Sequence, residues 1–174
     1  VDFSRIKRLR FSELGNIHIQ GGENFPKYMD FSNCFSVVIS HVTLNGDENI
    51  KWASDSVVSS VRNIPANTDL SNCRQVYIKH SSFAKDGELK MGGVCDLDFV
   101  TFPKKVDFSK CDGIFSKYKN ELDGVEEIKF RNKAHKRELI SKLGEYNGEV
   151  VFEEGGKELG LKDRLNILFR RRAC

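Results

Sequence analysis

The sequence predicts a mainly β fold, a parallel β-solenoid that ends in a cap with helices. Three observations predict it. Proline recurs in one slot, at Pro26, Pro65 and Pro103, with spacings of 39 and then 38 residues. A strand-like phrase, apolar–charged–apolar, recurs about every 20 residues and stops after Phe130. Repeats of this length are typical of solenoids, whose units bury their apolar faces by stacking on one another.

Length and composition exclude several classes of protein. The chain has 174 residues, of which 39% are hydrophobic and 30% charged, so it is long enough for a core and too apolar for wholesale disorder. No apolar run approaches the roughly eighteen residues of a spanning helix, so no membrane partner is expected. The 28 Lys and Arg nearly balance the 25 Asp and Glu. The resulting net charge of +3 is too small to indicate nucleic-acid binding by itself.

The first strand column carries alternating charge. Side chains alternate along a strand, so the outer residues of each phrase point inward and the middle one points outward. Stacked in order, the middle positions are Arg10, Asp30, Lys51, Asp69, Lys90, Asp107 and Lys129. Neighbouring strands lie about 4.8 Å apart, so each charge has an opposite charge above and below it. Exposed ion pairs add little stability, so we interpret the column as a device against slippage: a shifted strand would place like charges beside each other. The column thus predicts a fixed register between turns.

The inward positions of the same column form the expected core. Seven of them follow the charged residue of their unit and the eighth follows Val151; in order they are Phe11, Phe31, Trp52, Leu70, Met91, Phe108, Phe130 and Phe152. Apolar side chains dominate this set, and each unit depends on its neighbours to bury them. We therefore assign Trp52 to the core, and not to a ligand platform.

A second strand column follows in each unit. Its outward positions are read as His18, Val38, Ser59, Tyr77, Asp98 and Phe115. Val38, Tyr77 and Phe115 would form an exposed apolar stripe with intervals of about 10 Å. Exposed aromatic patches mark interfaces. The sequence thus predicts a face for a protein partner at His18, Val38, Tyr77, Asp98 and Phe115; the alternative is that another part of the protein covers the stripe.

Three of the phrases resemble the strand part of leucine-rich repeats, which reads apolar-x-apolar-x-x-Asn/Cys. They are Met29-x-Phe31-x-x-Cys34, Thr68-x-Leu70-x-x-Cys73 and Val106-x-Phe108-x-x-Cys111. The intervening units depart from the pattern, with Leu14, Asp55, Val94 and Lys133 in the Asn/Cys slot. The resemblance covers roughly residues 1–152 and implies a binding scaffold more often than an enzyme. Two architectures stay open, a right-handed β-helix and a leucine-rich-repeat-like arc, and the second strand column favours the β-helix.

The two ends of the chain differ. We assign residues 1–130 to the solenoid and 131–174 to a cap, because a solenoid needs an atypical unit over its last open edge. Lys133 to Leu143 is predicted as a helix that stops at Gly144, Glu149 to Phe152 as a last strand, and Leu161 to Arg172 as a second helix. Residues 3–11 align with the inside of a repeat and no Met precedes them. We therefore expect this chain to be the C-terminal recognition part of a larger protein.

The five cysteines are predicted to be structural residues and not members of a disulfide or a zinc site. Cys34, Cys73 and Cys111 share one slot in alternate units, about 9.6 Å apart. That exceeds the reach of about 7 Å of a disulfide and excludes a shared zinc ion. Buried thiols are consistent with a reducing compartment, either the cytoplasm or one into which the protein is delivered. Cys95 and Cys174 have no evident partner, and we expect no catalytic residue, metal or cofactor.

The C-terminal part is the basic part of the chain. Its basic cluster consists of Arg131, Lys133, Lys136, Arg137, Arg170, Arg171 and Arg172. The terminal arginines allow an alternative function, nucleic-acid binding, and a carbohydrate-active β-helix is a third. The latter needs clustered acids, which the matched charge column does not offer. The leading prediction is a non-enzymatic scaffold that binds another protein through a lateral strand face.

Overall fold

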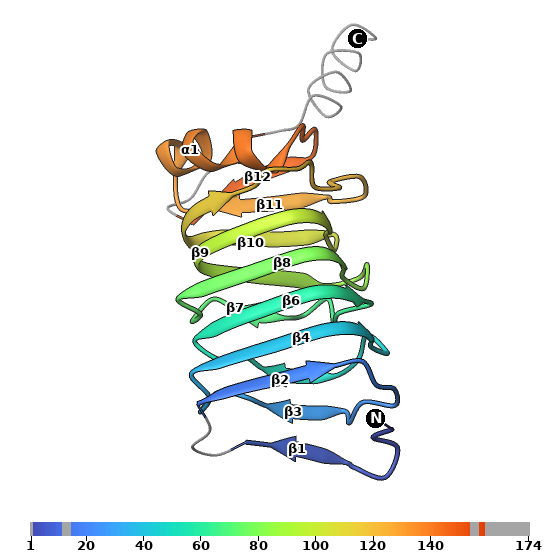
Figure 1. The fold of residues 1–174 in the computed structure, drawn as a ribbon. Helices are drawn as coiled ribbons and strands as arrows, with labels where there is room; N and C mark the ends of the chain where they lie inside the picture. Colours follow the sequence, from blue (N-terminus) through green and yellow to red (C-terminus); the bar gives the residue numbers. More distant parts are fainter. Residues whose placement is uncertain (1, 12–14, 154–156, 159–174) are drawn as a thin grey trace, which may run out of the picture.

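The chain winds into a parallel β-solenoid of about seven turns in the computed structural model (Figure 1). The structure describes residues 2–11, 15–153 and 157–158. The predicted fold class is confirmed, since the fold is mainly β, with stacked parallel strands and one short helix near the C-terminus.

One face of the solenoid, which we name the lateral sheet, contains the longer strands. It consists of four strands and of the second halves of two more: β2 (Asn16–Gln20), β4 (Ser36–Thr43), β6 (Asp55–Arg62), β8 (Gln75–Ser82), β9 (Glu88–Thr101) and β10 (Lys105–Phe115). Each pairs in parallel with the strand of the next turn, without interruption. This sheet gives the solenoid a continuous wall.

The opposite face carries the alternating charges, and we name it the column face. It consists of the first halves of β9 and β10 together with β1 (Arg8–Arg10), β3 (Tyr28–Asp30), β5 (Asn49–Lys51), β7 (Asp69–Leu70), β11 (Glu127–Phe130) and β12 (Glu149–Phe152). A short antiparallel strand, β13 (Lys157–Glu158), pairs with β12. Pro26, Pro65 and Pro103 lie in bends between strands, where their missing N–H is not needed.

The predicted register of the charge column is confirmed within two runs of strands. Arg10 pairs with Asp30 and Asp30 with Lys51, whereas Asp69, Lys90, Asp107 and Lys129 pair in a second run. The ion pair of Lys129 with Asp107 measures 3.1 Å, and that of Lys51 with Asp30 3.7 Å. The prediction of a continuous column is wrong at one place, because β5 and β7 are not paired and belong to separate sheets.

The core runs along the axis between the two faces. Every predicted inward residue from Phe31 to Phe152 is buried, and Phe11 is half-buried against them. Phe11 stacks on Phe31 with ring centroids 5.4 Å apart, and Phe108 on Phe130 at 6.1 Å. Stacked repeats thus place like side chains on one another, as a solenoid core requires.

The predicted register of the second column is wrong in two turns. Val38 pairs with Val57, not Ser59, and Tyr77 pairs with Asp96, not Asp98. In the first case the inward position is taken by Ser56, which is fully buried and donates a hydrogen bond to the carbonyl of Ala53 (3.1 Å). A shift by two residues preserves the alternation of a strand, so the apolar pattern alone favoured the wrong alignment.

The predicted helix and last strand are confirmed. The helix, α1 (Lys133–Leu143), begins after Asn132, whose side chain accepts a hydrogen bond from the backbone N–H of His135 (3.0 Å). Leu139 and Leu143 are buried, and the helix contacts β10 and β11 (Figure 1). The second predicted helix, from Leu161 to Arg172, lies outside the described residues.

The carboxylate of Asp107 makes the stability of the column face depend on pH. Burial alone would raise the pKa of Asp107, but the N–H of Ser109 (2.8 Å) and the ammonium of Lys129 (3.1 Å) donate to it and bring the net pKa below its ordinary value. A carboxyl with a lowered pKa in the folded state stabilises the fold above its unfolded pKa, near 3.9, and loses this contribution as the pH falls. We expect the difference in unfolding free energy between wild type and Asp107→Asn to shrink from pH 7 to about pH 3 in urea titrations. A difference that stays constant over that range would contradict this assignment.

Candidate functional site

The lateral sheet presents a central row of outward side chains. Strand pairing places His18, Val38, Val57, Tyr77, Asp96 and Phe115 in line across six strands. Tyr77 is 37% exposed and Phe115 64% exposed, whereas Val38 is half-buried between its neighbours. The structure therefore brings together four of the five residues predicted to contact a partner, and it adds Val57 to them.

Asp98, the fifth predicted residue, does not belong to this row. It is 5% exposed and accepts hydrogen bonds from the backbone N–H groups of Lys117 (2.8 Å) and Tyr118 (3.0 Å). Burial would raise the pKa of Asp98, but these bonds and Lys79 lower it overall. The carboxylate of Asp98, in β9, thus binds the bend that follows β10. A partner could contact Asp98 only if that bend opened.

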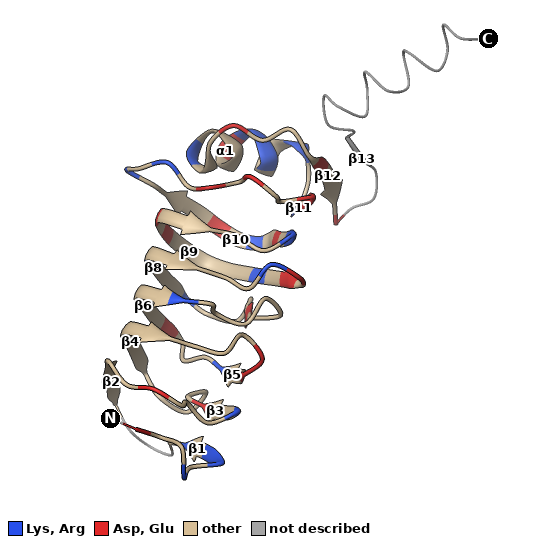
Figure 2. Ribbon diagram, turned by 90° about the vertical axis from the view of Figure 1, so that its right-hand side faces the viewer, with Lys and Arg blue, Asp and Glu red and all other residues tan. Residues whose placement is uncertain are grey.

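The charges around the central row are compensated. Asp55 forms an ion pair with Arg74 (2.7 Å), and Lys79 forms one with Asp96 (3.2 Å). The other outward neighbours in β2, β4 and β8 include the uncharged polar residues Asn16, Ser36 and Gln75. Figure 2 shows the lateral strands mostly tan, with more of the charged residues on the strands and bends opposite. The centres of protein interfaces are likewise poor in charge and rich in aromatic residues.

A second row of side chains lies near the C-terminal ends of the lateral strands, two residues before the last residue of each strand. It contains His41, Ser60, His80 and Phe99, one from each of four successive turns, and each has a positive φ between 49° and 56°. His80 stacks on Phe99 at 4.8 Å, and Phe99 stacks on Tyr118 at 4.9 Å. This left-handed backbone turns Phe99 outward, where it is 46% exposed, although alternation predicted it inward. The spacing of 19 or 20 residues was visible in the sequence, but the backbone angle was not.

The predicted basic cluster does not form one group in the structure, because Arg131 lies before α1 and the lysines and Arg137 lie on it. Arg131 donates from Nε to the carbonyl of Ser109 (3.0 Å) and pairs with Asp112 at 3.6 Å, so it holds neighbouring turns together. Lys133, Lys136 and Arg137 lie on α1. The three predicted nucleic-acid contacts, Arg170, Arg171 and Arg172, lie outside the described residues.

Two cysteines are in contact that the sequence did not connect. Cys34, Cys73 and Cys111 are buried as predicted, and burial raises the pKa of Cys73 to about 11. Cys111 lies beside Cys95 with their Sγ atoms 3.4 Å apart, and the hydrogen bond between them raises the pKa of Cys95. Their repeat slots differ, so spacing gave no sign of this contact. Cys73 and Cys95, whose pKa values are raised, are therefore protonated, buried thiols, which are poor nucleophiles.

Within the part of the chain that the structure describes, no three His, Cys, Asp or Glu side chains are arranged to hold a metal ion. The one helix in those residues, α1, is too short and too polar to cross a membrane. The chain was also compared with protein-family models, curated proteins and solved structures, and none of them matches.

Proposed function

We propose that this chain is a non-enzymatic repeat scaffold that binds another protein through the lateral sheet. The observation that carries the proposal is the central row, in which Val38, Val57 and Tyr77 lie on adjacent strands and Phe115 follows two strands further. The resemblance of the column phrases to leucine-rich repeats also supports a scaffold role, because proteins with such repeats are binding scaffolds more often than enzymes.

The chemistry of the row favours a protein surface with an apolar centre. Tyr77 offers an aromatic ring on a strand that is paired on both sides, and a tyrosine side chain has only two χ angles to fix, so little side-chain entropy is lost when a partner covers it. The neighbouring ion pairs leave no net charge for a polyanion to contact. A flat sheet with a few aromatic anchors is suited to recognition, whereas catalysis needs a concave pocket.

The double variant Tyr77→Ala with Phe115→Ala is expected to lose its partner. Truncation of a central aromatic residue typically weakens binding by about 2 kcal/mol, or roughly 30-fold, for each anchor. Affinity capture from a lysate of the source cells compares three baits: wild type, the double variant, and Tyr28→Ala, which removes an aromatic ring from the column face. We expect one protein on the wild-type and Tyr28→Ala baits that is absent from the double variant.

Two results would oppose the proposal. Equal recovery of every protein on all three baits would show that the row is not the contact surface. Capture of nothing by the wild type would show that this face does not bind protein with useful affinity. Circular dichroism and thermal unfolding of each bait verify that the substitutions leave the fold intact.

A further inference from the structure

The second row is a column of stacked rings in which one level carries no ring. His41, Ser60, His80 and Phe99 lie at equivalent positions of successive paired strands, and Tyr118 continues the stack in the bend after β10. Each of these levels except that of Ser60 carries an aromatic or imidazole ring. The levels of His41 and His80 are therefore separated by one level without a ring.

The empty level has the thickness of one planar ring. Neighbouring strands lie about 4.8 Å apart, so the two steps from position 41 to position 80 span about 9.6 Å. The filled part of the column keeps the same interval, with ring centroids 4.8 Å apart between His80 and Phe99 and 4.9 Å apart between Phe99 and Tyr118. The rings in each pair are within 19° of parallel, so their faces are turned along the axis of the solenoid. A planar ring at the level of Ser60 would thus meet the free face of His80 at a normal stacking distance.

A groove of about 510 Å³ opens at this level. The residues that line it come from β4, β6 and β8, and they are His41, Val42, Thr43, Ser60, Arg62 and His80. Its volume is within the range of known ligand sites, about 300–1,000 Å³. Because β6 is paired with β4 and with β8, a ligand in the groove lies between side chains and leaves the backbone ladders in place.

The polar groups of this groove are free within the described part of the chain. There, the side chains of His41, Ser60 and Arg62 have no hydrogen-bond or ion-pair partner, and no carboxylate lines the groove. Arg62 is exposed, so its guanidinium keeps all five N–H donors for an anion. The groove therefore combines a place for a ring with an uncompensated positive charge.

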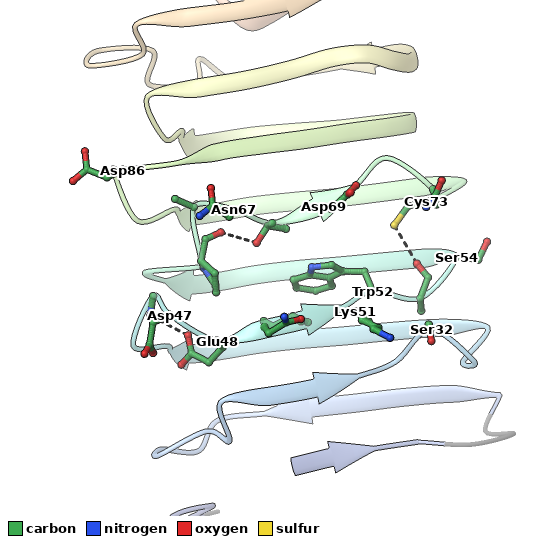
Figure 3. Close-up of a pocket in the computed structure, with 18 residues that line it drawn as sticks. Ser32, Asp47, Glu48, Lys51, Trp52, Ser54, Asn67, Asp69, Cys73 and Asp86 are labelled. Atoms are coloured by element: carbon green, nitrogen blue, oxygen red, sulfur yellow. Dashed lines mark hydrogen bonds between the residues drawn. The ribbon is translucent and has the colours of Figure 1, made fainter. Parts of the chain in front are cut away.

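A second groove, on the column face between β5 and β7, is larger at about 700 Å³ but has its charges paired (Figure 3). Asp47 forms an ion pair with Lys27 (3.0 Å), and Asp86 forms one with Lys104 (2.9 Å). Glu48 accepts hydrogen bonds from two backbone N–H groups of its own loop (2.7 and 2.9 Å). Little charge remains there for a ligand, in contrast to the groove of the second row.

The groups around the empty level match the parts of a nucleotide. Stacking on rings is available to every nucleobase, because each has an aromatic face. The hydroxyls of Ser60 and Thr43 favour a ring whose edge carries nitrogen and oxygen atoms over a phenyl ring, which would leave them without partners. Arg62 lies two residues beyond Ser60 on β6, about 6.6 Å along the strand, and a guanidinium binds phosphate with two parallel hydrogen bonds.

We propose that the groove of the second row binds one nucleotide, with its base stacked between the imidazoles of His41 and His80 and its phosphate on the guanidinium of Arg62. The hydroxyl of Ser60 contacts the edge of the base. One unpaired guanidinium matches one phosphate, so the bound unit is a single nucleotide, either free or as one residue of a single strand. The site lies beside the central row of the lateral sheet and shares no residue with it.

The test is a titration of the full chain with adenosine 5′-monophosphate, at constant pH, in which the imidazole C–H signals are followed by NMR. The chain has four histidines. His18 lies in the central row and His135 is buried on α1, so both serve as internal controls. Because the ring current of a stacked base shifts the signals of the rings on its two faces, we expect saturable upfield shifts for His41 and His80 and none for the other two histidines.

Ser60→Phe fills the empty level from within the chain. Ser60 has a φ of 56° and Phe99 one of 54°, so this backbone accepts a phenylalanine. We expect the variant to bind the nucleotide at least tenfold more weakly and to unfold at the wild-type temperature or above it. The matched control, Ser60→Ala, keeps the level open and should weaken binding by no more than about fivefold.

The contribution of Arg62 is measured with two further probes, adenosine and inorganic phosphate. Wild type is expected to bind the nucleotide about tenfold more tightly than adenosine, and phosphate alone is expected to shift neither imidazole. Arg62→Gln should bind the nucleotide and adenosine equally. A 5′-phosphorylated tetramer of deoxyadenosine separates the two sources of the ligand: tighter binding that weakens steeply with salt assigns a single strand, and equal binding assigns a free nucleotide.

Three results would overturn the proposal. The first is no saturable shift of His41 and His80, and the second is undiminished binding by Ser60→Phe. The third is tighter binding of the dipeptide amide acetyl-Trp-Asp than of the nucleotide, which would assign the empty level to an aromatic side chain of a protein. The double variant Tyr77→Ala with Phe115→Ala should bind the nucleotide as wild type does, so failure of this site and failure of the lateral sheet are distinguished.

Discussion

Replacement of Phe108 by alanine is expected to lower the free energy of unfolding by about 3–5 kcal/mol. The ring is fully buried, stacks on Phe130 at 6.1 Å and meets the edge of Phe102 at 6.2 Å. Its removal leaves a cavity between turns that are fixed by the ladders on both sides of β10, so little collapse is possible. Urea titration at neutral pH measures the loss.

The matched control is Phe115→Ala on the same strand. Phe115 is 64% exposed, so the same truncation should change the free energy of unfolding by no more than about 0.5 kcal/mol. Equal losses in the two variants would mean that β10 does not present Phe108 inward and Phe115 outward. The alternation on which both the core and the candidate interface depend would then be wrong.

Gly92→Ala is expected to destabilise the solenoid by about 3 kcal/mol, the upper end of the range for overpacking. A Cβ at this position would lie within 3.0 Å of three backbone atoms of Ser71 in the turn below. Backbone atoms cannot rotate away as a side chain can, so β9 and its neighbouring turn must separate. Thermal unfolding followed by circular dichroism measures the effect.

Gly113→Ala is the control for that substitution, because a Cβ there has no atom within 4 Å. Gly113 pairs with Val94 on the lateral sheet, and its alanine variant should unfold at nearly the wild-type temperature. An unaffected Gly92→Ala variant would contradict the close approach of the bend in β9 to the turn that contains Ser71.

The fold was predictable because two independent patterns repeat together. Each column phrase pairs an inward apolar residue with an outward charge, and the alternation of Asp30 and Lys51, or of Asp107 and Lys129, fixes one register. The second column lacks such charges. A shift of two residues in that column leaves every inward residue inward and every outward residue outward, so the apolar pattern cannot detect it. For this reason Asp98 was predicted at the position that Asp96 occupies.

The opening between β5 and β7 was not predictable from the same patterns. The phrase Thr68-Asp69-Leu70 fits the column as well as its neighbours do, and Trp52 reads as one more core residue. Within the described residues, the indole N–H of Trp52 has no hydrogen-bond partner. Whether a buried N–H finds an acceptor depends on packing in three dimensions, which the sequence pattern does not show. Likewise, Tyr77 and Phe115 follow from alternation, whereas the stack of Phe99 on Tyr118 follows from a left-handed backbone angle.

Hydroxyl-radical footprinting tests most directly whether the lateral sheet is the recognition face. The chain is labelled alone and when saturated with the protein that the wild-type bait retains, and oxidation of each aromatic residue is measured by mass spectrometry. We expect oxidation of Tyr77 and Phe115 to fall in the complex and that of Tyr28, on the column face, to stay unchanged. Protection of Tyr28 with undiminished oxidation of Tyr77 and Phe115 would contradict a lateral binding face.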